Sequence, residues 1–255
     1  MKTYLLYIAY DGTDFHGWQK QKNVVTVQAA VEQALSALVK QEVAVTASGR
    51  TDEGVHALHQ AVSFACETPV PAASFPSALN ALLPPSVRAL SCCEAEEGFC
   101  ARKAAKRKTY VYRFYLSEQD SPVFGRYALR VGKPLDLPLL QKACEMIVGT
   151  HDFSGFYCMG SSAKTTVRTI YDCSFAFRKG QGIEPDGYEF RICGNGFLYK
   201  MVRLLVSALL RVENGTLSLS DFSAAVCSPA EAKGKSVKKI PAPSHGLFLE
   251  SVEYV

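Results

Sequence analysis

The chain has 255 residues, of which 48% are hydrophobic and 20% charged, and this composition is typical of a folded globular protein rather than a disordered one. Its nine cysteines include no C-x-x-C pair, which argues against a zinc site and favours reduced thiols. No run of about eighteen apolar residues occurs, and the N-terminus carries no signal-peptide pattern. We therefore expect a cytoplasmic protein without membrane association.

The first half of the chain is predicted to follow the order β-α-β-β-α-β. Lys2 to Tyr10 alternates as a strand, and the apolar residues from Val27 to Leu38 repeat at helical spacing behind Thr26, a suitable N-cap. Further strands are expected at 42–46, 60–66 and 87–92, with a short helix within 71–83.

The second half is predicted to repeat this order in outline. Strands are expected at 108–116, 166–177, 188–192 and 247–254, and helices at 137–148 and 201–212. Because acidic residues and a glycine interrupt the apolar pattern after Glu94, we expect domains over 1–100 and 101–255. The predicted fold is α+β, with two ferredoxin-like (β-α-β-β-α-β) halves packed around a largely antiparallel mixed sheet and an inter-domain cleft as the natural site.

A polar, turn-forming stretch over 48–57 separates two of the expected strands of the first half. Asp52 stands two residues after Arg50 and two before Gly54, so a turn would present a carboxylate beside a cation that keeps it ionised. An ordinary turn, in which the aspartate bonds its own backbone, is the competing interpretation. His56 and His59 are three residues apart, but the alternation that follows indicates a strand and separates them, so we expect no metal site.

Two clusters of basic residues favour an RNA or DNA backbone as partner, although most such clusters are simply solvated. The first contains Arg102, Lys103, Lys106, Arg107 and Lys108, and the second Lys233, Lys235, Lys238 and Lys239. Arg102, Lys106 and Arg107 are candidate substrate contacts. The Gly194-Asn195-Gly196 segment lacks the third glycine of a dinucleotide loop, and no phosphate-binding Gly-Lys-Ser/Thr occurs, so no nucleotide cofactor is expected.

Four segments together resemble the TruA-type tRNA pseudouridine synthases. They are YDGTDFHGWQ (10–19), GRTDEGVHA (49–57), FLYKMVR (197–203) and HGLFL (245–249), and the resemblance runs nearly end to end. It implies a pseudouridine synthase fold and the conversion of uridine to pseudouridine in the anticodon stem-loop, at tRNA positions 38–40. It also implies tRNA as partner, no cofactor, and a homodimer.

The resemblance implies roles for individual residues. Asp52 matches the catalytic aspartate, and Arg50 the arginine that holds the target nucleotide out of its stack. Tyr110 matches the tyrosine that stacks on the uracil and accepts its proton, Arg203 the basic residue that pairs with the aspartate, and Leu198 lies beside the pocket. From their positions alone, Tyr110 would be a core tyrosine and Arg203 a surface arginine. Whether Asp52 attacks the sugar or the base stays open.

Some residues depart from the family pattern. Cys100 replaces a usual histidine, Ser207 a usual glycine, and Lys238 to Pro241 a usual Ala-Gly-x-Thr, which leaves the identity of the RNA target open. Two other functions also remain open: a non-catalytic RNA-binding or RNA-folding protein, and a hydrolase with Asp52 as general base, which lacks a second acid at a recognisable spacing.

Overall fold

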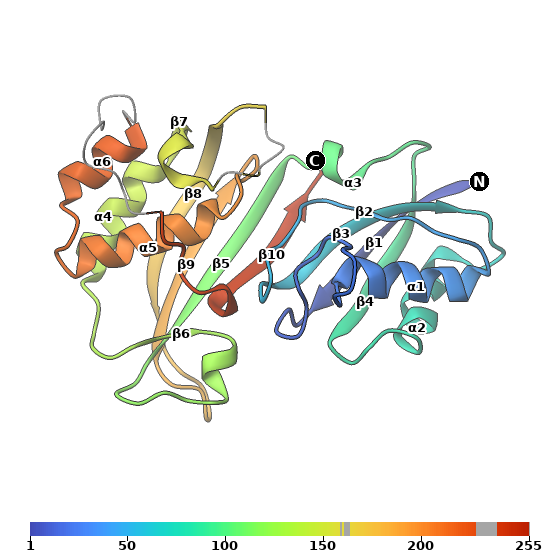
Figure 1. Ribbon diagram of the computed structural model, residues 1–255, viewed down its shortest axis with the longest axis horizontal. Coiled ribbons are helices and arrows are strands. Elements are labelled where there is room, and N and C mark those ends of the chain that lie inside the picture. Colours follow the sequence, from blue (N-terminus) through green and yellow to red (C-terminus); the bar gives the residue numbers. More distant parts are fainter. Residues whose placement is uncertain (159, 161–163, 228–238, 255) are drawn as a thin grey trace. The chain divides into compact units, whose positions relative to one another are not determined.

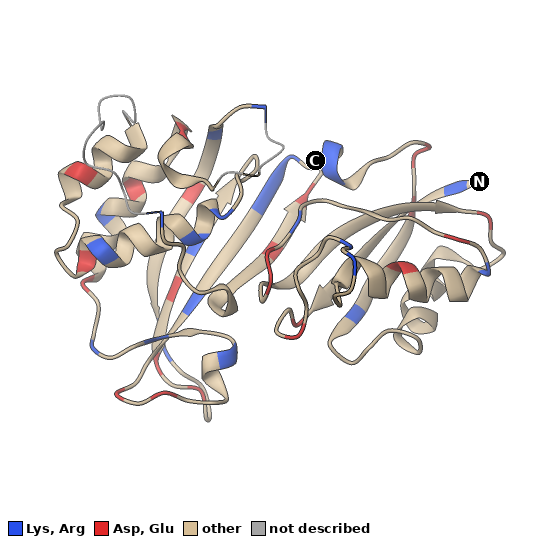
Figure 2. Ribbon diagram, in the orientation of Figure 1, with Lys and Arg blue, Asp and Glu red and all other residues tan. Residues whose placement is uncertain are grey.

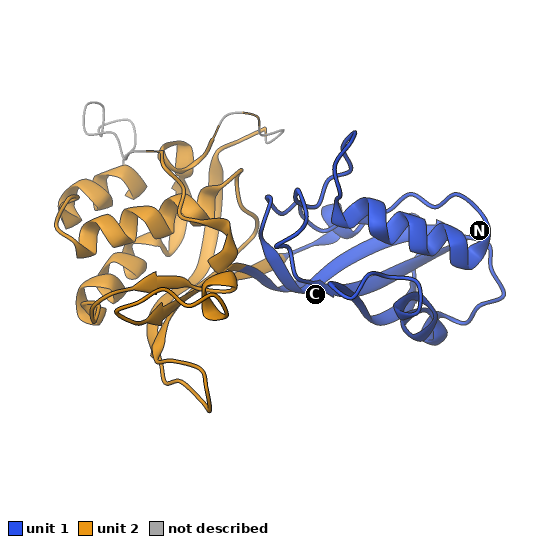
Figure 3. Cartoon of the chain, turned by 60° about the horizontal axis from the view of Figure 1, so that its bottom comes forward, with its two compact units in different colours: residues 1–106, 248–255 blue, residues 107–247 orange. Residues whose placement is uncertain are grey.

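The computed structural model describes residues 1–158, 160, 164–227 and 239–254 (Figure 1). The chain divides into two compact units, coloured separately in Figure 3: unit 1 is Met1–Lys106 with Phe248–Val255, and unit 2 is Arg107–Leu247. We had expected domains over 1–100 and 101–255. In the structure, residues 248–255 fall in unit 1, where Phe248 pairs with His56 and Leu249 with Ala57.

Unit 1 combines a sheet with three helices. The strands are β1 (Lys2–Tyr10), β2 (Thr46–Ala47), β3 (His56–Cys66), β4 (Val87–Ala95) and β10 (Leu247–Glu253), and the helices are α1 (Val27–Val39), α2 (Phe75–Asn80) and α3 (Ala101–Ala104). The order in the sheet is β4-β1-β3-β10, and β2 also pairs with β3. β10 runs parallel to β3, whereas β1 pairs with β3 and β4, and β2 with β3, in antiparallel fashion.

The predictions for β1 and α1 are confirmed. The Thr26 side chain accepts a hydrogen bond from the Ala29 N–H, which satisfies one of the donors left unpaired at the start of a helix. The helix buries an apolar stripe that includes Val27, Val31 and Leu35, as its 3.6-residue spacing predicted.

The predicted strand over 42–46 is wrong, because only Thr46 and Ala47 pair with a neighbouring strand. The preceding backbone is instead held by side chains of α1. Ser36 Oγ accepts from the Val43 N–H at 3.0 Å, and Glu32 Oε1 accepts from the Val45 N–H at 3.2 Å. The alternation of Val43 and Val45 therefore reflects burial against the helix and not a full strand.

Unit 2 combines further strands with longer helices. Its strands are β5 (Arg107–Leu116), β6 (Leu129–Val131), β7 (Gly149–Asp152), β8 (Val167–Arg178) and β9 (Gly187–Gly194), and its helices are α4 (Leu137–Ile147), α5 (Met201–Glu213) and α6 (Leu219–Cys227). The order is β5-β9-β8-β7, antiparallel throughout, and β6 pairs in parallel with β5. The strands and helices predicted for this part are present, whereas the sequence patterns had not indicated β6, β7 or α6.

Aromatic side chains form the centre of each unit. In unit 1, Tyr4 stacks on Phe64 at 5.2 Å and contacts Phe75 at 5.1 Å between ring centroids. In unit 2, Phe114 on β5 lies 5.4 Å from Phe175 on β8. The fold is therefore α+β with mostly antiparallel strands, as predicted, while the ferredoxin-like description and the cleft stay predictions. No helix in the described part of the chain is long and apolar enough to cross a membrane.

Candidate active site

Asp52 lies in the loop between β2 and β3 of unit 1. A turn forms at this point, because the Val55 N–H donates to the Asp52 carbonyl at 3.2 Å and Gly54 takes a φ of 74°, which favours glycine. Asp52 is half-buried, whereas Arg50 and Glu53 are exposed. The predicted acid thus begins a tight turn, and the neighbouring cation lies two residues earlier in the same loop.

The segment over 10–19 anchors this loop. Tyr10 Oη and Thr51 Oγ1 are 2.8 Å apart in a buried hydrogen bond, and the Trp18 N–H donates to the Thr51 carbonyl at 3.1 Å. The Gly54 N–H donates to the Phe15 carbonyl at 3.4 Å. Burial raises the pKa of Tyr10, so its hydroxyl stays protonated. Thr51 and Gly54, which flank Asp52 and Glu53, are therefore fixed from outside the loop.

Two glycines make this close approach possible. A Cβ on Gly12 would lie 2.0 Å from the Val55 carbonyl oxygen, and one on Gly17 would lie 2.8 Å from that of Thr51. Gly17 also has a φ of 82°, a conformation that other residues rarely adopt. Any side chain at these two positions would push the anchoring segment away from the Asp52 loop.

His56 holds the other end of the loop. Its Nδ1 accepts from the Gly12 N–H at 3.1 Å, and Asp11 Oδ1 lies 3.1 Å from the same nitrogen. The buried ring stacks on Phe248 with 4.6 Å between centroids. His56 and His59 both belong to β3, where His56 is buried and His59 is exposed. Among the described residues, no group of three or more His, Cys, Asp or Glu side chains is arranged to hold a metal.

The beginning of the loop is fixed by a buried pair of polar side chains. Ser48 Oγ donates to Gln60 Oε1 at 2.6 Å, and Gln60 Nε2 donates to the Gly49 carbonyl at 2.7 Å. The Ser48 N–H also donates to the Ala61 carbonyl at 2.8 Å. Hydrogen bonds thus restrain the loop at its start, its middle and its end.

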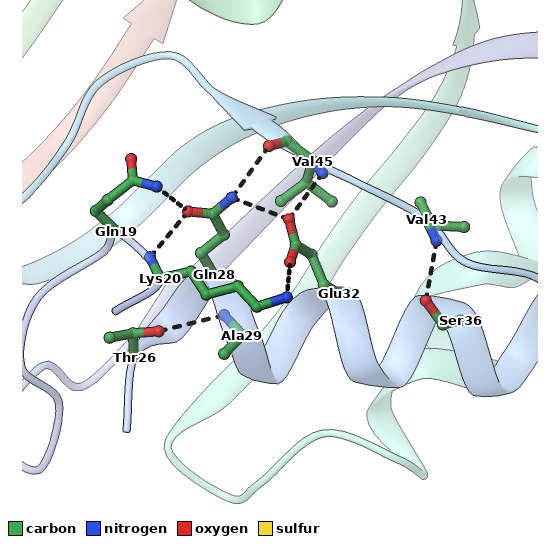
Figure 4. Close-up of polar contacts among 9 residues, drawn as sticks. All are labelled: Gln19, Lys20, Thr26, Gln28, Ala29, Glu32, Ser36, Val43 and Val45. Carbon is green, nitrogen blue, oxygen red and sulfur yellow. Dashed lines mark hydrogen bonds and ion pairs between the residues drawn. The ribbon is translucent and has the colours of Figure 1, made fainter. Parts of the chain in front are cut away.

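A polar network joins α1 to the segment that precedes this helix in the chain and to the segment that follows it (Figure 4). Glu32, buried on α1, accepts from the Val45 N–H, from Gln28 Nε2 at 2.9 Å, and from Lys20 Nζ at 3.1 Å. Gln28 Oε1 in turn accepts from Gln19 Nε2 at 2.9 Å and from the Lys20 N–H at 3.0 Å. The chain that anchors the Asp52 loop and the chain that enters it are therefore tied to the same helix.

In unit 2, Tyr110 and Leu198 are both buried. Tyr110 on β5 is 8% exposed and makes an edge-to-face contact with Phe197, with 5.2 Å between centroids. Leu198 follows Phe197, and its carbonyl accepts the Met201 N–H at 3.1 Å where α5 begins. The segment that precedes α5 thus packs the Phe197 ring against Tyr110 of β5.

Arg203 lies in the first turn of α5 and is fastened to the segment over 242–246. Its Nε donates to the Ala242 carbonyl at 2.7 Å, and its own carbonyl accepts the Ala242 N–H at 3.0 Å. Tyr112 Oη donates to the Pro243 carbonyl at 2.8 Å, which holds the same segment. Burial, and then the Arg203 charge, lower the pKa of His245, so this imidazole is neutral near pH 7.

The basic candidates lie on the surface. Arg102 on α3, Lys106 and Arg107 are exposed, and Figure 2 shows the positive charge on α3 and at the start of β5. The Arg107 guanidinium lies 4.7 Å from the centroid of the Tyr171 ring. Of the second cluster, Lys233, Lys235 and Lys238 lie outside the described residues. Of the departures, Cys100 is the N-cap residue of α3 and Ser207 lies on α5, while Lys238 is again outside the described part.

The structure thus groups the predicted site residues within each unit. Asp52 and Arg50 share one loop of unit 1, whereas Tyr110, Leu198 and Arg203 belong to β5 and the start of α5 in unit 2. Sequence reasoning had treated Tyr10 and Thr51 as parts of two motifs and had not found their hydrogen bond. A buried tyrosine needs a partner for its hydroxyl, but the sequence does not show which residue supplies it.

Comparison with known proteins extends over the whole chain. A family model described as tRNA pseudouridine synthase matches residues 6–110 and 143–255. The chain is 36% identical over 254 residues to tRNA pseudouridine synthase A of Thermoanaerobacter sp. (strain X514), and 39% identical over 254 residues to the protein of the same name from Acetivibrio thermocellus. The match to the Caldicellulosiruptor saccharolyticus protein of that name is 38% over 255 residues, and all three alignments cover 100% of both chains. The chain therefore belongs to the tRNA pseudouridine synthase family, a family of isomerases.

Proposed function

We propose that this protein converts uridine to pseudouridine at positions 38–40 of the tRNA anticodon stem-loop, without a cofactor. The observation that carries the proposal is the full-length similarity to proteins named tRNA pseudouridine synthase A. The matched residues include the whole Asp52 loop and the start of α5. The positions 38–40 come from the resemblance to the TruA type.

The proposed reaction rearranges one nucleotide and loses no atoms overall. The bond from C1′ to N1 breaks, the uracil turns, and a bond from C1′ to C5 forms. The proton on C5 leaves to solvent, and N1 gains a proton in its place. Because no electrons are transferred to another molecule, the chemistry needs only a carboxylate, a proton acceptor and groups that hold the base.

Asp52 supplies the carboxylate in this proposal. Its support is the rigid turn, in which Thr51 on one side and Val55 on the other are held by backbone hydrogen bonds. A side chain held this way needs little reorganisation when the substrate arrives, which favours catalysis. Arg50, exposed in the same loop, stabilises the nucleotide after it leaves the helical stack.

Tyr110 and Arg203 complete the proposed catalytic set. Tyr110 stacks on the freed uracil and accepts the C5 proton, directly or through water. Arg203 stabilises the charged form of Asp52, and its bond through Nε to Ala242 fixes the plane of the guanidinium group. Arg102, Lys106 and Arg107 bind the phosphate backbone, and Leu198 lines the pocket.

We further infer that each unit is ferredoxin-like and that the protein acts as a cytoplasmic homodimer. The order β1-α1-β2-β3-α2-β4 in unit 1 supports the first inference. The dimer comes from the family resemblance, and the cytoplasmic location is inferred from tRNA as the proposed substrate.

Release of tritium tests the proposed chemistry. Purified protein is incubated with tRNA transcripts that carry tritium at uracil C5, and tritium in the water is measured. We expect release with the native protein and loss of at least about 1,000-fold in rate with Asp52→Asn, which keeps the shape of the side chain but removes its charge. Absence of release from every tRNA offered would contradict the proposal, and release of free uracil would indicate a hydrolase.

A further inference from the structure

Two pairs of tyrosine and lysine lie together on unit 2. Lys200 Nζ is 5.0 Å from the centroid of the Tyr199 ring, and Lys239 Nζ is 5.0 Å from that of the Tyr157 ring. The Cys158 N–H donates to the Tyr199 carbonyl at 3.1 Å, so the two tyrosine-bearing segments run side by side. We call these four residues, Tyr157, Tyr199, Lys200 and Lys239, the Tyr-Lys platform.

The rings of the platform are accessible. Tyr199 is 41% exposed although it directly follows the buried Leu198, and Tyr157 is half-buried. Both rings are therefore within reach of a ligand. Each ring is also accompanied by an ammonium group, which adds positive charge to an apolar face.

The platform is held in place by its supports. Tyr157 follows a 3₁₀ turn whose Phe153 and Phe156 are fully buried, and Lys239 Nζ donates to the Ser154 carbonyl at 3.4 Å. Lys200 has a φ of 61°, which is unfavourable for a residue with a Cβ and persists where neighbouring structure fixes it. The two segments therefore present their rings without a large ordering cost.

A ring with an adjacent cation suits one class of ligand, the unpaired nucleotide. The ring stacks on a base of any sequence, and the ammonium group neutralises the neighbouring phosphate. We propose that the Tyr-Lys platform binds an unpaired nucleotide of the RNA substrate beside the target uridine, with Tyr199 as its principal stacking residue. The inference rests on the proposed function for the identity of the RNA, but not on any catalytic step.

Binding measured without turnover tests the proposal. The probe is a fluorescein-labelled RNA hairpin with the anticodon stem and loop, and affinity is read from fluorescence anisotropy. Tyr199→Leu is expected to weaken binding by about 5- to 100-fold, the range for loss of one stacked base. Tyr199→Phe keeps the ring and should bind within about two-fold of the native protein. Phe177→Leu removes another exposed aromatic of unit 2, 47% exposed on β8, and is the matched control.

A second RNA identifies stacking as the cause. When the loop nucleotides are replaced by abasic ones, native binding should fall, while binding by Tyr199→Leu should fall little further. Lys200→Met should reduce the slope of log affinity against log salt concentration by about one. If Tyr199→Leu does not fold, this variant tests the platform in its place.

Three results would overturn the platform. The first is unchanged binding by Tyr199→Leu. The second is an equal loss of affinity through Tyr199→Leu for the normal hairpin and for the abasic one. The third is a loss of affinity with Phe177→Leu as large as that with Tyr199→Leu. If these occur while tritium release persists, the proposed function stands and the platform alone fails. If the native protein binds no RNA hairpin and releases no tritium, both fail.

Discussion

The buried carboxylate of Glu32 provides a quantitative test of how the Asp52 loop is supported. Glu32→Ala leaves the Val45 N–H without its acceptor, and an unsatisfied buried donor costs about 1–3 kcal/mol. The ion pair with Lys20, whose side chain is 60% exposed, adds at most about 1 kcal/mol. Gln28 keeps a contact to the Val45 carbonyl at 3.5 Å, and alanine favours a helix by a few tenths of a kcal/mol. We therefore expect a net loss of about 1–3 kcal/mol in the free energy of unfolding.

The assay is urea denaturation followed by tryptophan fluorescence. Trp18 is the only tryptophan of the chain and is buried in unit 1, so its signal reports the unit that contains Glu32. In thermal denaturation, the same loss corresponds to a fall of roughly 2–12 °C in melting temperature. Glu32→Gln retains one carbonyl acceptor and should lose only about 1 kcal/mol. Gln33→Ala, at an exposed position of the same helix, is the control, and an equal effect of Glu32→Ala and Gln33→Ala would refute the reasoning.

Three further changes address the loop, a helix cap and the dependence on pH. Gly12→Ala should reduce turnover by at least about ten-fold, because its Cβ would lie 2.0 Å from the Val55 oxygen; turnover equal to native would contradict this packing. Thr26→Ala should cost about 0.5–1 kcal/mol in urea denaturation, the low end for an N-cap because the bond is 3.4 Å long; no measurable loss would mean that the cap is not formed. Burial and the Arg203 charge lower the pKa of His245, so below about pH 6.5 the unfolded chain takes up a proton that the native chain resists, and stability falls with falling pH. His245→Gln should reduce the decrease in the free energy of unfolding between pH 7.5 and 5. An unchanged decrease would contradict the lowered pKa of His245.

The sequence predicted those elements of the fold whose information is local. The strand over Lys2–Tyr10 and the helix after Thr26 were found because alternation, helical spacing and the cap lie within one short segment. The strand over 42–46 was predicted wrongly because its backbone donors go to Ser36 and Glu32, and periodicity does not identify a side chain as the partner. β6 and β7, with three and four residues, are too short to establish a period.

For the candidate site too, the sequence indicated local features and missed long-range contacts. The resemblance identified Asp52, Tyr110 and Arg203, and their roles stay predictions. The contacts that support them join distant positions, for example Tyr10 with Thr51, 41 residues apart, and Tyr112 with Pro243, 131 residues apart. Such contacts depend on the whole fold, so no local pattern of residues could have indicated them.

Mapping of the product tests the central claim most directly. Unmodified tRNA is incubated with the native protein or with Asp52→Asn, and pseudouridines are located by carbodiimide modification and primer extension. The account predicts pseudouridine at one or more of positions 38–40 after incubation with the native protein, and none after incubation with Asp52→Asn. Equal amounts of pseudouridine from both proteins would contradict the role of Asp52, and pseudouridine confined to other positions would contradict the proposed target.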